Sequence, residues 1–141
     1  MLHDVIHLLE PEQRFRHAML LAHFACINGA VTKEELSFFE QRLGASMLSP
    51  ERRRQLRDYL VNPPNLEDCL DGLSQQAGKL ALRDACLMSL ADREIDAKEK
   101  AMLERLAEEV GVEEELIDEI VKWVVQGYHW IQGGYDMLDM N

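Results

Sequence analysis

The sequence predicts an all-α fold, a single-domain bundle of about seven or eight helices. Three observations lead to this fold class. Apolar residues recur every three or four positions through most of the chain, helix-capping patterns separate the periodic stretches, and no segment shows the sustained alternation of a strand. The 141 residues have the length of one domain, so we assign residues 1–141 to a single domain.

Two stretches, residues 18–27 and 80–91, are apolar almost all round. A helix without a polar face must be surrounded by other helices, so these two are the expected central pair of the core. Asp84 interrupts the second stretch. Because an isolated buried carboxylate would be protonated, we expect Asp84 to pair with a group near Arg83 or with a helix terminus in the core. The alternative is that Asp84 adds a ligand to a cation site near residue 92.

The other expected helices each carry one apolar face. Their apolar positions are Leu36, Phe39 and Leu43; Leu56, Tyr59 and Leu60; Met102, Leu103, Leu106, Ala107 and Val110; and Leu116, Ile117, Ile120, Val121, Val124 and Val125. The expected N-caps are Thr32 and Asp96, each followed three residues later by a glutamate, Ser49 before Pro50, and Asn65. The expected helix stops are Gly111, Gly127 and the pair Gly133–Gly134.

This pattern repeats at an offset of 64 residues, which aligns Asn28 with Asp92, Thr32 with Asp96 and Glu35 with Glu99. The alignment predicts two copies of one unit, repeat 1 at about residues 14–61 and repeat 2 at about residues 78–126, followed by a tail at 127–141. Each unit contains a buried helix that it cannot cover alone. We therefore expect the two units to pack around a pseudo-two-fold axis as one core.

Charge and composition exclude several classes of function. Fifteen basic and 26 acidic residues leave a net charge of −11, which disfavours binding to nucleic acid. The longest apolar run falls short of the ~20 residues of a membrane span, although peripheral attachment to a membrane stays open. Three widely spaced cysteines and the absence of a secretory signal pattern predict a cytoplasmic location. Since apolar neighbours raise a thiol pKa, we expect no nucleophilic catalysis and no enzyme activity.

The segment from Leu90 to Lys100, followed by Leu103, Leu106, Gly111 and Leu116, resembles the TerB-like (tellurite resistance protein B) family. That family carries a turn of the form A-D-G-x-[IV]-[DTS]-x-x-E at the end of a buried helix, and residues 28–35 are a weaker second copy. The resemblance implies an all-helical domain without enzyme activity, a role in bacterial tellurite or other stress responses, and acidic turn residues that bind a divalent cation. Two residues depart from the pattern, since Arg93 stands where the family commonly has Gly and Asn28 replaces the first-copy aspartate.

Four carboxylates crowd this turn, those of Asp92, Glu94, Asp96 and Glu99. Hard oxygen ligands of this kind suit Ca²⁺ or Mg²⁺, and we expect any such site to be weak. The alternative is structural, with Asp96 and Glu99 capping one helix, Asp92 ending the preceding one, and Glu94 solvated. The sequence therefore predicts either a divalent-cation site or a set of helix caps.

Two further features point to a protein partner. The C-terminal tail is rich in aromatic residues and Met, among them Tyr128, Trp130 and Tyr135. We expect the tail to dock on its own domain, and the alternative is a partner-binding or dimerising patch. Four arginines form a basic edge that suits an acidic partner unless it is simply a solvated face: Arg52, Arg53, Arg54 and Arg57.

The leading hypothesis is a non-enzymatic, cytoplasmic stress-response or signalling module that acts through protein partners and holds Ca²⁺ or Mg²⁺ at its acidic turn. The second hypothesis is a metal-free homo-oligomeric helical adaptor. In that case the C-terminal tail and the basic edge, with Arg53 and Arg57, form the contacts between copies.

Overall fold

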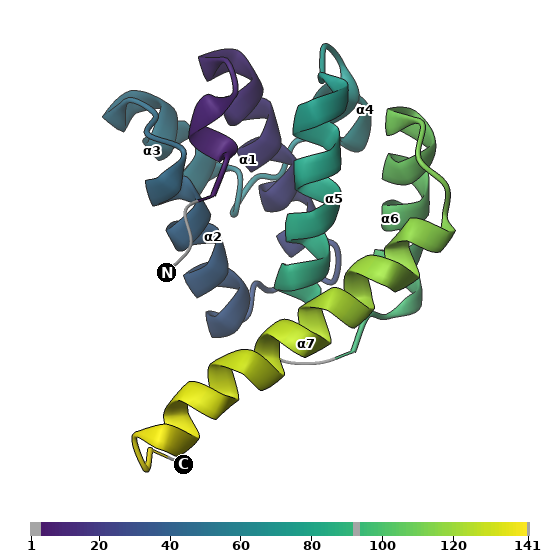
Figure 1. The fold of residues 1–141 in the computed structure, drawn as a ribbon. Coiled ribbons are helices and arrows are strands. Elements are labelled where there is room, and N and C mark those ends of the chain that lie inside the picture. The colour runs from purple at the N-terminus through teal and green to yellow at the C-terminus, as the bar shows by residue number, and fades with distance from the viewer. Residues whose placement is uncertain (1–3, 92–93, 141) are drawn as a thin grey trace.

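The computed structural model describes residues 4–91 and 94–140, and this part of the chain is all-helical (Figure 1). A short 3-10 helix, Ile6–Leu8, precedes seven α-helices. In chain order these are α1 (Pro11–Ala25), α2 (Lys33–Ala45), α3 (Pro50–Asp58), α4 (Leu66–Leu70), α5 (Gln75–Ser89), α6 (Ala97–Val110) and α7 (Glu115–Met137). No strand occurs in the described residues, and the predicted all-α bundle is confirmed.

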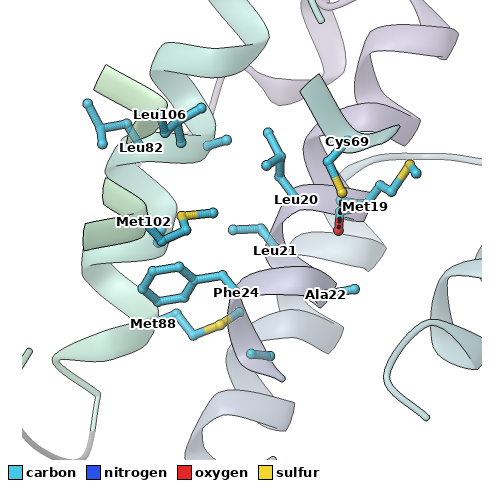
Figure 2. Packing of buried hydrophobic residues seen from close by; sticks show 14 of the residues in the cluster. Met19, Leu20, Leu21, Ala22, Phe24, Cys69, Leu82, Met88, Met102 and Leu106 are labelled. Carbon is cyan, nitrogen blue, oxygen red and sulfur yellow. Dashed lines mark hydrogen bonds between the residues drawn. The ribbon is translucent and has the colours of Figure 1, made fainter. Parts of the chain in front are cut away.

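The helices α1 and α5 lie side by side at the centre of the bundle, as predicted from their apolar sequences (Figure 1). Helix α1 also contacts α2, α3 and α4, while α5 also contacts α2, α6 and α7. Figure 2 shows Leu21 and Phe24 pointing from α1 toward Met88 of α5 and Met102 of α6, and all four side chains are buried. Because burial of one such side chain contributes roughly 1.5–3 kcal/mol, this shared cluster holds the two central helices together.

Side-chain caps start most of the helices. Thr32 Oγ1 accepts a hydrogen bond from Glu35 N at 3.1 Å, and Thr32 N donates to Glu35 Oε1 at 3.0 Å, which completes the predicted capping box of α2. Ser49 and Asn65 cap α3 and α4, also as predicted. Ser74 caps α5, although this cap was not among those predicted. Each such cap contributes about 0.5–2 kcal/mol and fixes where its helix begins.

The helix bounds follow the offset seen in the sequence. Helices α1 and α5 each have 15 residues and begin 64 positions apart, at Pro11 and Gln75. Helices α2 and α6 also begin 64 positions apart, at Lys33 and Ala97. Both halves of the chain are thus built from the same succession of a central helix, a turn and a covering helix.

Helix α7 differs most from expectation. The predicted stops at Gly127 and Gly133–Gly134 are wrong, because α7 runs unbroken from Glu115 to Met137. A glycine inside a helix costs only about 1 kcal/mol relative to alanine, and here apolar residues keep the helical period beyond each glycine. Gly111 does end α6 as predicted, with a φ of 73° in the left-handed region. Residues 127–137 are therefore the distal part of a long helix.

Gly78 of α5 permits the close approach of α6. A Cβ at this position would lie 2.1 Å from Val110 Cγ1, whereas a Cβ on Gly44 of α2 would meet no heavy atom within 4 Å. We expect Gly78→Ala to lower the free energy of unfolding, because overpacking costs about 1–3 kcal/mol against a gain of roughly 1 kcal/mol in helix propensity. Gly44→Ala gains propensity alone, so we expect it to raise that free energy. Urea denaturation measures both variants, and equal shifts of the two midpoints would contradict this account.

Candidate functional site

The turn after α1 meets the turn before α6, where the acidic site is predicted. Asn28 Nδ2 donates hydrogen bonds to Asp96 Oδ2 at 2.5 Å and to Glu99 Oε1 at 3.0 Å. Ser89 Oγ donates to the other carboxylate oxygen of Glu99. Asp96 Oδ1 accepts from Glu99 N at 2.9 Å, so the predicted cap of α6 is confirmed. Two of the predicted ligands, one from the cap and one from the first turn of α6, thus share a side-chain amide.

The Asn28 amide gives these carboxylates a positively polarised partner. Its two N–H bonds only donate, and each is directed at a carboxylate oxygen. Glu99 is buried, and a buried carboxylate needs such donors to offset the loss of water. Asp96 and Glu99 also make other interactions in the structure. The aligned asparagine, seen in the sequence only as a departure from the family motif, is therefore a structural donor between the two turns.

The other predicted ligands are placed differently. Glu94 is exposed to solvent, and Asp92 lies outside the described residues, as does Arg93. Across residues 4–91 and 94–140, no group of three or more His, Cys, Asp or Glu side chains is arranged to hold a metal ion. The divalent-cation site formed by Asp92, Glu94, Asp96 and Glu99 therefore stays a prediction.

A second polar cluster lies inside the bundle, between α1, α2 and α5. Asp84 is 0% exposed, and its Oδ2 lies 2.8 Å from Nε2 of His17, which is 1% exposed. Its Oδ1 accepts from Arg83 Nε at 2.9 Å and lies 3.2 Å from Arg42 Nη2. The prediction that Asp84 pairs within the core is confirmed, because its partners among the described residues are His17, Arg83 and Arg42.

Asp4 completes this cluster from the N-terminal segment. Its Oδ2 lies 3.1 Å from Arg42 Nη1 and 3.0 Å from Arg83 Nη2, so two carboxylates face two guanidinium groups. The Arg42 guanidinium also lies 5.0 Å from the centre of the Phe38 ring. Nothing in the sequence pattern singled out Asp4, because its partners lie 38 and 79 residues away.

The electrostatics of the cluster keep Asp84 ionised. Burial raises the pKa of the Asp84 carboxyl, but the hydrogen bonds and charges of His17 and Arg83 outweigh burial and hold this pKa below its usual range. The pKa of Asp4 is also lowered, since Arg83, Arg42 and a backbone hydrogen bond outweigh its partial burial. Neither Asp84 nor His17 reaches solvent, so this pair has no surface on which to meet a substrate.

The thiols are held protonated at neutral pH. Burial raises the pKa of Cys69 and of Cys86 to about 12, with a further contribution from a nearby aspartate in each case. Burial and the charge of Glu35 raise the pKa of Cys26 as well. The predicted effect of the surroundings on the thiols is confirmed, and none of the three is activated as a nucleophile.

Two of the four arginines of the basic edge on α3, Arg52 and Arg57, form ion pairs within the chain. Arg57 donates from Nε and Nη2 to both carboxylate oxygens of Glu40, at 2.9 and 3.0 Å. Arg52 pairs with Glu12 at 3.1 Å and lies 4.2 Å over the Phe15 ring. Arg53 Nε is buried and lacks a hydrogen-bond partner among the described residues. Arg57 thus already carries an ion pair, and the binding of a partner by Arg53 and Arg57 stays a prediction.

The predicted aromatic positions lie on α7, whose C-terminal half extends away from the other helices (Figure 1). Its first half packs on α5 and α6 and buries Ile117 and Val124. Beyond Val124, the large apolar side chains up to Met140 are all at least 42% exposed, and Trp130 reaches 71%. The expectation that this segment docks on its own domain is wrong for these side chains, because the continuous helix carries them past the bundle.

Helix α7 is long, yet no helix in the described parts of the chain is both long enough and apolar enough to span a membrane.

Comparisons with protein-family models, with curated proteins and with solved structures return no significant match to this chain. The resemblance of residues 90–100 to the TerB-like family therefore stays a prediction based on the turn motif.

Asn28→Asp would set a third carboxylate against Asp96 and Glu99. Two hydrogen bonds to charged acceptors are lost and the charges repel, so we expect the Tm of the chelator-treated variant to fall by about 5–10 °C. Added Ca²⁺ or Mg²⁺ should restore much of this loss, because a cation replaces the lost donor. Asn28→Ala is the matched control, which loses the same hydrogen bonds without adding a carboxylate, so its melting temperature should respond less to each cation than that of Asn28→Asp. Thermal melts of both variants with each cation test this prediction. A melting temperature of Asn28→Asp that changes with neither Ca²⁺ nor Mg²⁺ would contradict it.

Asp84→Asn would leave Arg42 and Arg83 facing a reduced negative charge in the core, at an expected cost of about 3–5 kcal/mol near neutral pH. Because the pKa of Asp84 is lowered in the folded protein, its contribution is complete above about pH 4 and is lost as the pH falls through the folded-state pKa. The stabilities of wild type and variant should therefore converge in acid. Urea midpoints between neutral and acidic pH measure this, and a constant gap would contradict it. Asp4→Asn, at a partly exposed carboxylate, should show the same trend with a smaller amplitude.

Proposed function

We propose that this chain is a non-enzymatic helical module that acts by binding a protein through the distal part of α7. One observation carries the proposal. Helix α7 has 23 residues, its first half is packed on the bundle, and its second half presents aromatic and aliphatic side chains to solvent. The distal face consists of five exposed side chains of this half and of the C-cap: Trp130, Ile131, Tyr135, Met137 and Leu138.

The distal face continues the side of α7 that packs on the bundle. Residues seven apart lie on nearly the same side of a helix, so the buried Ile117 and Val124 lead on to Ile131 and Leu138. Two flanking rows with the same spacing are also apolar: Leu116, Trp123, Trp130 and Met137 on one side, and Val121, Tyr128 and Tyr135 on the other. Together these rows span about 160° of the helix circumference.

The size and chemistry of the distal face favour a protein partner. With roughly 200 Å² for a fully exposed large side chain, its exposed fractions correspond to an area on the order of 600 Å². A contiguous apolar patch of about 600 Å² is at the upper end of what soluble monomers expose, and patches of this size are often functional. Trp and Tyr are also enriched among the residues that dominate binding. Residues 123–135 contain no Asp, Glu, Lys or Arg, so a partner would bury this stretch without desolvating a full charge.

The described polar clusters support a binding role over a catalytic one. His17 and Asp84 are enclosed by the bundle, and the thiols of Cys69 and Cys86 are protonated at neutral pH. A cytoplasmic setting and a part in a bacterial stress response, such as that to tellurite, are proposed on the resemblance of residues 90–100 and on the three free cysteines.

Site-specific photo-crosslinking in living cells tests this function. A benzophenone amino acid at Ile131 would stand in the middle of the distal face, and one at exposed His129 would stand on the opposite side of the same turn. We expect a protein adduct from position 131 that is much weaker from position 129. Equal adducts from both positions, or none from position 131, would contradict the proposal.

A further inference from the structure

A shallow apolar depression lies where α7 leaves the bundle. It is lined by Leu116, Ile120 and Trp123 of α7, together with Glu119 and Arg83. Trp123, which lines this depression, is 53% exposed. One helix thus carries two apolar features, the depression at its root and the distal face toward its tip.

A second copy of this chain matches both features at once. The distal face presents on the order of 600 Å², and the exposed part of Trp123 with the depression brings this to about 700–800 Å². A stable protein interface of standard size takes about 800 Å² from each partner. A two-fold arrangement uses the same surface on both copies, so each tip would cover the root of the other.

The geometry of α7 requires that the two helices run antiparallel. A crossing near residue 129 sets Leu138 of one copy beside Ile120 of the other, because both lie nine residues from the crossing. The two bundles then sit at opposite ends of the helix pair. A parallel pair would instead press together two bodies that each carry a net charge of −11.

Two glycines on the contact side fit a close helix pair. Gly127 and Gly134 are seven residues apart on the side of Ile131, and a Cβ at either would meet no heavy atom within 4 Å. In an isolated helix, each of these glycines lowers the stability of the helix by about 1 kcal/mol relative to alanine, and no contact compensates for the loss. Against a second helix they allow the two backbones to approach more closely.

The charges of α7 make a membrane surface a less suitable partner than a second copy of the chain. Amphipathic helices that bind membranes carry mainly Lys and Arg on their polar side. Helix α7 carries instead four acidic residues, Glu115, Asp118, Glu119 and Asp136, against a single Lys122. Anionic lipid headgroups would repel this surface.

We propose that two copies of this chain associate through α7 as an antiparallel, two-fold helix pair, with the tip of each helix covering the depression beside Trp123 of the other. This inference rests on the proposed function, because both use the distal face. It adds the identity of the partner and the direction of the contact.

Sedimentation velocity on the full chain tests the association. At about 100 µM, where a micromolar contact is mostly formed, we expect a mass twice the 16.2 kDa of the single chain. Ile131→Glu buries a charge in the contact and should return the mass to 16.2 kDa with unchanged helix content by circular dichroism. His129→Glu adds the same charge on the opposite side and should stay dimeric. A wild type that remains a single chain, or a dimeric Ile131→Glu variant, would overturn the proposal.

Spin labels test the direction of the helices. Single cysteines at His129 and Asp136 lie seven residues apart on the polar side, and Cys26→Ala removes the native thiol that is partly exposed. Cys69 and Cys86 stay buried and protonated. In an antiparallel pair the labels at 136 are about 20 Å further apart along the helix axis than those at 129. Equal distances between copies at both positions would overturn the antiparallel arrangement.

The two proposals fail in distinguishable ways. A wild type that stays a single chain in solution, combined with a cross-link from position 131 to a different protein, overturns self-association and leaves the proposed function standing. A single-chain wild type with no cross-link from position 131 overturns both. A cross-linked species of twice 16.2 kDa that contains this chain alone supports both.

Discussion

The carboxylate of Asp84 is the constraint on which the arrangement of the bundle depends. It is fully buried in one of the two central helices, so water cannot stabilise its charge. Its partners come from separate elements, His17 from α1, Arg42 from α2 and Arg83 from α5 itself. Apolar side chains tolerate many neighbours, whereas a buried charge requires donors at particular distances. A cluster of this kind contributes little net stability when complete, but it restricts how α2 lies against α1 and α5.

Those features of the fold that depend on neighbouring residues could be predicted from the sequence. The lack of a polar face on residues 18–27 and 80–91 is a local property, and it identified the central pair correctly. The cap at Thr32 needs only a glutamate three positions later. The stops at Gly127 and Gly133–Gly134 were wrong because glycine lowers helix stability without ending a helix, unless the chain also turns into the left-handed region, as it does at Gly111.

The candidate site depends on contacts between residues that are far apart in the chain, which a local sequence pattern does not reveal. Asp96 and Glu99 could be placed together because they lie in one turn, but their shared donor, Asn28, is 68 and 71 residues away from them. The amide was visible in the sequence only as an exception to a motif. The aromatic residues of α7 were equally visible, yet their exposure depends on the direction in which the helix leaves α5 and α6, which no residue spacing encodes. In both cases the missing information is the relative placement of elements far apart in the chain.

The charge cluster also bears on the order in which the molecule can assemble. His17 and Arg42 are synthesised long before Asp84, and the contact between His17 and Asp84 closes a loop of 67 residues. Until α5 leaves the ribosome, helices α1 and α2 hold two of the groups that surround Asp84, His17 and Arg42, without the carboxylate that pairs with them. Closing long loops slows folding, since the entropy of closure is lost before the contact forms. We therefore expect the two halves of the chain to fold as one cooperative unit, with neither half stable when separated from the other.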